Sequence, residues 1–148
     1  MEDRYLYKAK TTPKEKGEFN NVWVAGNLIV SNGKYYIHSV GNVVNVKNET
    51  GRIIVMHEVI PDTICQCTGL KDKNGKLIWE NDICDRKEEY PEIVKYNNGD
   101  WTLDYSYSKG KESGYCYCNL GFYALERKYV EVIGNTFDNP ELLESEEK

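Results

Sequence analysis

Residues 59–83 read VIPDTICQCTGLKDKNGKLIWENDI, and this stretch decides the fold of the chain. The pair Asn74-Gly75 at its centre tolerates positive φ at both middle positions of a type I′ turn. Apolar residues flank the pair on both sides, among them Leu70, Leu77 and Ile78. The pattern predicts a strand that ends near residue 70 or 71, a tight hairpin turn, and a second strand that begins near 76 or 77.

The same strand-and-turn pattern continues through the rest of the chain. Asn32-Gly33 and Asn98-Gly99 mark two further turns, and aromatic residues, which favour pleated surfaces, make up 12% of the sequence. Short strands with turn signals about every 8–12 residues are typical of all-β sandwiches and barrels. We therefore predict a mainly β protein with little helix, whose hairpins form a β-barrel or roll. The predicted strands are 4–10, 21–30, 34–40, 43–46, 53–60, 93–96, 101–105, 115–118 and 129–136, with a turn at 48–51 and one short helical turn within 120–128.

Composition and charge bound the compartment and the partners. The chain has 148 residues and a net charge of −5, so it lacks the basic footprint of a general nucleic-acid binder. Lys71, Lys73 and Lys76 crowd one turn, which is either a local basic patch or a solvated hairpin tip. The sequence has neither an apolar run of about 18 residues nor a signal-peptide start, so we expect a cytoplasmic protein without membrane contact.

Three blocks of the chain resemble one known family. They are residues 7–37, with the segments YKAK, VWVAGNLI and KYYI, the stretch 59–83, and residues 131–143, which read EVIGNTFDNPELL. In this order they resemble the YopX family, whose members occur in phages and prophages of Gram-positive bacteria. The resemblance implies an SH3-like β-roll in the C-terminal half and assigns no catalytic residues. We accordingly expect an N-terminal β subdomain at 1–60, an SH3-like roll at 61–143 and a frayed tail at 144–148.

The chain departs from the family pattern at a few positions within these blocks. Ala9 and Asn81 stand where the pattern has glycine, and Cys65 and Cys67 replace a glycine and an aromatic residue. These departures bear on the packing of the second hairpin more than on the fold.

The five cysteines form two Cys-x-Cys pairs, Cys65/Cys67 and Cys116/Cys118, together with Cys84. Residues two apart on a strand share a face, so the two pairs offer four ligands to zinc if they converge, which the sequence leaves open. The spacing within each pair is shorter than in the usual zinc knuckle, and thiols of a cytoplasmic protein stay reduced. We therefore expect no metal, no disulfide and no cofactor.

Candidate contact residues lie on strands and at one turn. Tyr35 and Tyr36 are neighbours on a strand, so they face opposite sides and one of them is expected to be exposed. With Lys71, Lys73 and Lys76 they are the candidate ligand contacts. The carboxylates between residues 82 and 92 are expected to form a solvated face; they are Asp82, Asp85, Glu88, Glu89 and Glu92.

These features favour a non-enzymatic phage accessory protein that binds a host or phage protein or assembles as a homo-oligomer, and so interferes with a host factor or defence. One alternative is a nucleic-acid-binding module built on the SH3-like roll and its aromatic residues. Another is sequestration of a small nucleotide, which requires a pocket with aromatic and cationic lining.

Overall fold

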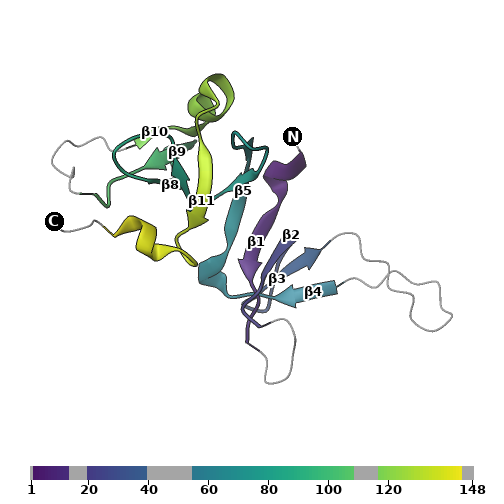
Figure 1. Ribbon diagram of the computed structural model, residues 1–148. Helices are drawn as coiled ribbons and strands as arrows, with labels where there is room; N and C mark the ends of the chain where they lie inside the picture. The colour runs from purple at the N-terminus through teal and green to yellow at the C-terminus, as the bar shows by residue number, and fades with distance from the viewer. Residues whose placement is uncertain (1, 14–19, 40–54, 109–116, 145–148) are drawn as a thin grey trace. The chain divides into compact units, whose positions relative to one another are not determined.

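The computed structural model describes residues 2–13, 20–39, 55–108 and 117–144 (Figure 1). The chain divides into an N-terminal unit, Glu2–Gln66, and a C-terminal unit, Cys67–Lys148. The predicted strand at 43–46, the predicted turn at 48–51, Cys116, and residues 145–148 of the predicted tail lie outside the described residues. The domain boundary expected after residue 60 stays a prediction.

The N-terminal unit is built on antiparallel strands. β1 pairs with β2, β2 with β3 and β3 with β4, and β1 also pairs with the first two residues of β5. One face of these strands buries Ala9, Ile37 and Val59 completely or almost completely. The elements are η1 (Glu2–Tyr5), β1 (Tyr7–Lys10), β2 (Trp23–Ser31), β3 (Lys34–Ser39), β4 (Val55–Glu58), η2 (Pro61–Thr63) and β5 (Cys65–Lys71).

Two glycines determine the turn after β2 and the close approach of β2 to β3. Asn32 and Gly33 have φ values of 51° and 72°, so the β2–β3 connection has the two positive φ values that the Asn-Gly pair predicts. At Gly26, a Cβ atom would lie 2.0 Å from the carbonyl oxygen of His38. The backbones approach so closely that only glycine fits, in agreement with the close approach that an isolated strand glycine indicates.

The C-terminal unit contains a five-stranded antiparallel sheet in the order β10-β9-β8-β7-β11. Its core buries Cys84, Val94 and Leu103 from three adjacent strands, with Leu120 and Val130 from the following segments. The end of β5 pairs with β6 in the same unit. The elements are β6 (Leu77–Trp79), β7 (Asp82–Asp85), β8 (Glu92–Asn97), β9 (Asp100–Asp104), β10 (Tyr117–Asn119), the π-helix η4 (Phe122–Arg127), β11 (Glu131–Asn135) and η5 (Pro140–Leu143).

In the hairpin within residues 59–83, the strands end and begin where predicted, but the turn between them differs from the prediction. β5 ends at Lys71 and β6 begins at Leu77, as predicted. Of the pair Asn74-Gly75 only Gly75 has a positive φ, of 80°, and its N–H donates to the carbonyl oxygen of Asp72 at 3.0 Å. The type I′ prediction for Asn74-Gly75 is therefore wrong.

The physical reason is the Asp72 side chain. Its Oδ1 accepts hydrogen bonds from the N–H groups of Asn74 and Lys76, both at 2.9 Å, and so holds the loop in a wider turn. Its Oδ2 accepts the N–H of Val132 in β11 at 3.0 Å. One carboxylate therefore closes the turn and links it to the edge of the five-stranded sheet.

The mainly β class with little helix is confirmed, and the helical turn predicted within 120–128 is present as η4. The predicted barrel is wrong: in the described part of the chain the strands form open antiparallel sheets. At the outer edge of β11, the N–H groups of Val132 and Asn135 donate to the side chains of Asp72 and Asn139, so side chains replace a closing strand. The SH3-like assignment stays a prediction. No helix among the described residues is long and apolar enough to cross a membrane.

Candidate functional site

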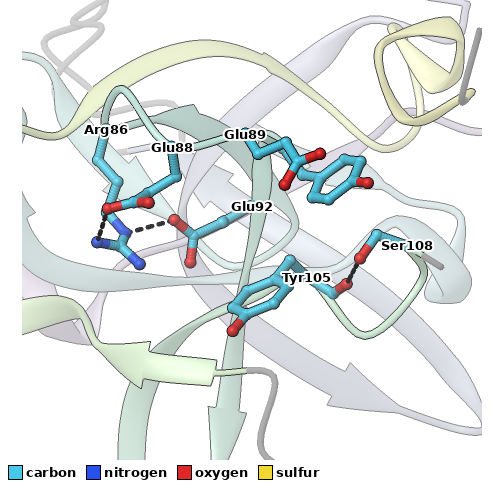
Figure 2. A pocket seen from close by; sticks show the side chains of 7 residues that line it. Arg86, Glu88, Glu89, Glu92, Tyr105 and Ser108 are labelled. Atoms are coloured by element: carbon cyan, nitrogen blue, oxygen red, sulfur yellow. Dashed lines mark hydrogen bonds and ion pairs between the residues drawn. The ribbon is translucent and has the colours of Figure 1, made fainter. Parts of the chain in front are cut away.

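The C-terminal unit contains a pocket of about 270 Å³, here called the Glu92 pocket (Figure 2). One wall comes from the connection between β7 and β8 and from the first residue of β8. The other wall comes from the segment that follows β9. The lining residues are Arg86, Glu88, Glu89, Tyr90, Glu92, Tyr105 and Ser108.

The register of β7 and β8 explains why a charged pair lies in the wall. Glu92 pairs with Cys84 across the ladder, so both side chains point to the same face as Val94, the face on which Cys84 and Val94 join the core cluster of this unit. Arg86 follows Cys84 by two residues and is directed to the same side. The core face of the sheet thus ends in an arginine and a glutamate instead of two apolar residues.

Arg86 is held from every side. Its Nε donates to Oε1 of Glu92, and its Nη1 donates to Oε1 of Glu88 at 3.0 Å (Figure 2). Its Nη2 donates to Sγ of Cys118 at 3.3 Å. The guanidinium carbon also lies 4.3 Å from the centre of the Tyr123 ring. Burial works to lower the pKa of Arg86, but the hydrogen bond and charge of Glu92 outweigh it and raise the pKa. The guanidinium therefore remains positively charged, and this charge pairs with the carboxylates of Glu92 and Glu88.

Glu92 is the unusual group of the pocket. Its side chain is 1% exposed, and among the described residues its Oε2 has no hydrogen-bond partner. Burial raises the pKa of Glu92, and the hydrogen bond and charge of Arg86 offset this only in part. Burying a carboxylate oxygen without a hydrogen-bond partner costs free energy, so Oε2 marks a position where a hydrogen-bond donor fits.

The opposite wall is fixed by hydrogen bonds within its own loop. The hydroxyl of Ser108 donates to the carbonyl oxygen of Tyr105 at 2.7 Å, and the N–H of Ser106 donates to Oδ1 of Asp104 at 2.7 Å. The hydroxyl of Tyr107 donates to the carbonyl oxygen of Pro91 at 2.6 Å and ties this loop to the start of β8. The Ser108 hydroxyl is thus bonded to the backbone, which is not the geometry of an activated nucleophile.

The charge of the lining favours a cation. Three glutamates face one arginine, and that arginine is already paired with two of them. The tyrosine rings add faces that attract ammonium and guanidinium groups. A phosphate placed here would meet three carboxylates, so the pocket lacks the cationic lining that nucleotide sequestration requires.

The candidate contact residues from the sequence lie elsewhere. Tyr35 packs against the N-terminal core, and Tyr36, its neighbour on β3, faces the other side of the sheet. Both side chains are half-buried, so the prediction that one of them is exposed is wrong. Lys71 and Lys76 are exposed, and Lys73 forms a 3.0 Å ion pair with Glu131. None of these five residues lines the Glu92 pocket.

The solvated carboxylate face that the sequence predicted is correct only in part. Glu88 and Glu89 are exposed, but Glu92 and Asp82 are buried. Asp82 is directed inward because its Oδ2 accepts the N–H of Trp79 at 2.8 Å. No local pattern marks Glu92 for burial, because Ile93 and Val94 beside it are both buried as well, and its pairing with Arg86 depends on strand register.

The four cysteines at the described positions form no disulfide bond. Cys65, Cys67 and Cys84 are buried and Cys118 is half-buried. Burial raises the pKa of the Cys84 and Cys118 thiols, which disfavours the thiolate. In the part of the chain that the structure describes, no three His, Cys, Asp or Glu side chains come together in a group able to hold a metal ion.

Comparison with known proteins gives a family and no curated relative. No curated protein matches the chain. The family described as YopX protein matches residues 4–144, almost the whole of the 148-residue sequence. The match includes both units and all the lining residues of the Glu92 pocket. The chain therefore belongs to the YopX family.

Proposed function

We propose that this protein is a non-enzymatic binding protein whose Glu92 pocket receives a positively charged side chain of a partner protein. The observation that carries the proposal is the buried Oε2 of Glu92, a residue of the pocket lining, which has no hydrogen-bond partner among the described residues. A lysine ammonium or an arginine guanidinium supplies the missing donor and balances the excess of carboxylates.

The charge of the C-terminal unit supports the same partner chemistry. Residues 67–148 contain 11 Lys and Arg against 17 Asp and Glu, a net charge of −6, whereas residues 2–66 contain 8 against 7, a net charge of +1. The acidity of the chain is thus concentrated in the unit that holds the pocket. Such a field accelerates the approach of a basic partner surface.

A buried glutamate with a raised pKa also occurs in acid–base catalysis, so catalysis by Glu92 is the alternative to binding. Oε1 of Glu92 accepts the Nε–H of Arg86, and the serine hydroxyl of the lining, on Ser108, is bonded to the backbone. This arrangement favours binding over proton transfer. The partner proposed here is a host or phage protein, in line with the phage accessory role that the resemblance implies, and the C-terminal unit is proposed to be an SH3-like roll.

The test is a titration of the full chain, followed by ¹⁵N–¹H NMR, with N-acetyl-arginine amide and N-acetyl-lysine amide. Adenosine monophosphate and N-acetyl-glutamine amide serve as anionic and neutral probes. We expect the cationic probes to shift the amide signals of Tyr105 and Ser108. Glu92→Gln should weaken the binding of the cationic probes about tenfold or more, since a hydrogen bond to a charged group contributes about 1.5–3 kcal/mol.

The matched control is Glu126→Gln, which removes the same charge from an exposed position of the same unit, outside the pocket. It should leave the titration unchanged. The proposal fails if the cationic probes give no shifts in the pocket, if adenosine monophosphate binds there more tightly than they do, or if both variants weaken binding equally.

A further inference from the structure

The outer face of the N-terminal unit, opposite its core, combines lysines with aromatic side chains. Strand alternation places Lys8 and Lys10 of β1 on this face, because Tyr7 and Ala9, which alternate with them along the strand, point into the core. The ladder sets Lys10 opposite Trp23 of β2. By the same register the face includes Lys8, Lys10, Trp23, Ala25, Asn27, Ile29, Lys34, Tyr36, His38, Met56 and Glu58.

The contacts on this face join the basic groups to the indole ring. The Nζ atoms of Lys8 and Lys10 lie 4.7 Å and 5.4 Å from the centre of the Trp23 ring. Trp23 is half-buried, so its ring is fixed by the sheet and still reaches the surface. Two ammonium groups on flexible stems therefore surround a rigid aromatic platform.

The charge of this face differs from that of the whole chain. Among the described residues of the outer face, Lys8, Lys10 and Lys34 are basic and Glu58 is acidic, 4.0 Å from Lys34. The face is therefore net basic, in a unit whose sequence is itself slightly positive while the rest of the chain has a net charge of −6. The global charge that argues against general nucleic-acid binding belongs to the other unit.

We propose that the outer face of the N-terminal unit binds single-stranded nucleic acid, with a base stacked on Trp23 and the flanking phosphates on Lys8 and Lys10. Aromatic platforms beside basic side chains are the combination that single strands require, because every base offers a π-face and every nucleotide a negative charge. A base that stacks on Trp23 displaces an ammonium group from the ring, and that ammonium is then within reach of the adjoining phosphate.

A second aromatic position extends the track. Tyr36 lies opposite Ile29, which follows Trp23 by six residues on β2, about 20 Å of strand at 3.3 Å per residue. Asn27 and His38 form the opposed pair between them and offer hydrogen-bonding side chains. The track is thus long enough for several nucleotides, and this inference is independent of the Glu92 pocket.

The test is fluorescence anisotropy of the full chain with labelled oligothymidylate and oligouridylate of 12 nucleotides, from 20 to 200 mM salt. We expect binding that weakens with salt, and Lys8→Gln with Lys10→Gln should reduce the slope of log K against log salt by about 1.4, at about 0.7 per lost contact. Trp23→Ala should weaken binding about tenfold at constant salt slope. The two oligonucleotides distinguish DNA from RNA as the natural strand.

The control variant is Lys71→Gln with Lys76→Gln, which removes two exposed lysines from the hairpin of the other unit. It should leave affinity and slope unchanged, and circular dichroism confirms that each variant is folded. The inference is overturned by the absence of binding at 20 mM salt, by an equal effect of the control, or by duplex DNA binding as tightly as the single strand. If Trp23→Ala does not fold, Trp23→Phe replaces it, and unchanged affinity in both Trp23→Phe and the double lysine variant also overturns the inference.

Discussion

Replacing Asp72 with asparagine should destabilise the C-terminal unit by about 2 kcal/mol. Asp72 accepts three backbone hydrogen bonds, and a bond to a charged group contributes about 1.5–3 kcal/mol. Asparagine keeps one carbonyl oxygen for the loop N–H groups of Asn74 and Lys76, which are also open to water. Its amide group cannot accept the N–H of Val132, so that bond is lost in full.

The stability difference between wild type and Asp72→Asn should also depend on pH. Burial works to raise the pKa of Asp72, but the hydrogen bonds from Val132, Lys76 and Asn74 outweigh it and hold the pKa below its usual range. A carboxyl group with a lowered folded-state pKa stabilises the protein above its unfolded pKa, about 3.9, and loses this contribution as the pH falls through the folded value. The difference between wild type and Asp72→Asn should therefore be constant near neutral pH and shrink below about pH 3.9.

The assay is urea unfolding by circular dichroism at pH 7, 5 and 3.5, with the free energy extrapolated to water. Asp62→Asn is the control, since it removes the same charge from an exposed position. A loss below about 0.5 kcal/mol, equal to a typical surface substitution, would refute the role of Asp72 as a link between the hairpin and β11. A difference in unfolding free energy between wild type and Asp72→Asn that widens towards low pH would refute the lowered pKa of Asp72.

Three further outcomes follow from the geometry. Gly75→Val should lower the melting temperature by several degrees, because φ is 80° at this position and a β-branched residue resists positive φ, at a cost of about 1–3 kcal/mol. Wild-type stability should decrease as pH rises above about 4.3, through the raised pKa of Glu92, and Glu92→Gln should lack this decrease in urea titrations. Elemental analysis of protein purified without chelator should find no stoichiometric zinc; about one zinc per chain, lost with stability in Cys65→Ser with Cys116→Ser, would contradict this.

The strand pattern was predictable because it depends on local chemistry. At Asn32-Gly33 and Asn98-Gly99 both residues have positive φ, so the dipeptide alone determined the turn. At Asn74-Gly75 the same dipeptide gave a different turn, because Asp72 binds two N–H groups of the loop. A side chain two residues before the pair thus overrode the strongest local signal.

The strand breaks and the pocket were harder to predict for a similar reason. Asn81, at a position where the family pattern has glycine, adopts a φ of 66° and separates β6 from β7. Asparagine tolerates this conformation, so the substitution preserves the break. The pocket depends on strand register, since Glu92 meets Arg86 only when β7 and β8 pair with Cys84 opposite Glu92. Carboxylates in a charged run give no local sign of which one is buried.

The residues that reveal the family are occupied in holding the backbone. Asp72 closes the hairpin of the central block, and in the C-terminal block Oδ1 of Asn135 accepts the N–H groups of Phe137 and Asp138 at 3.0 Å and 2.9 Å. Oδ1 of Asn139 accepts the N–H of Asn135 at 3.2 Å. These side chains have few remaining groups for a ligand, whereas the Glu92 pocket is lined by residues 86–108, between the blocks. The three blocks therefore specify the scaffold, whereas the residues that line the Glu92 pocket lie between them.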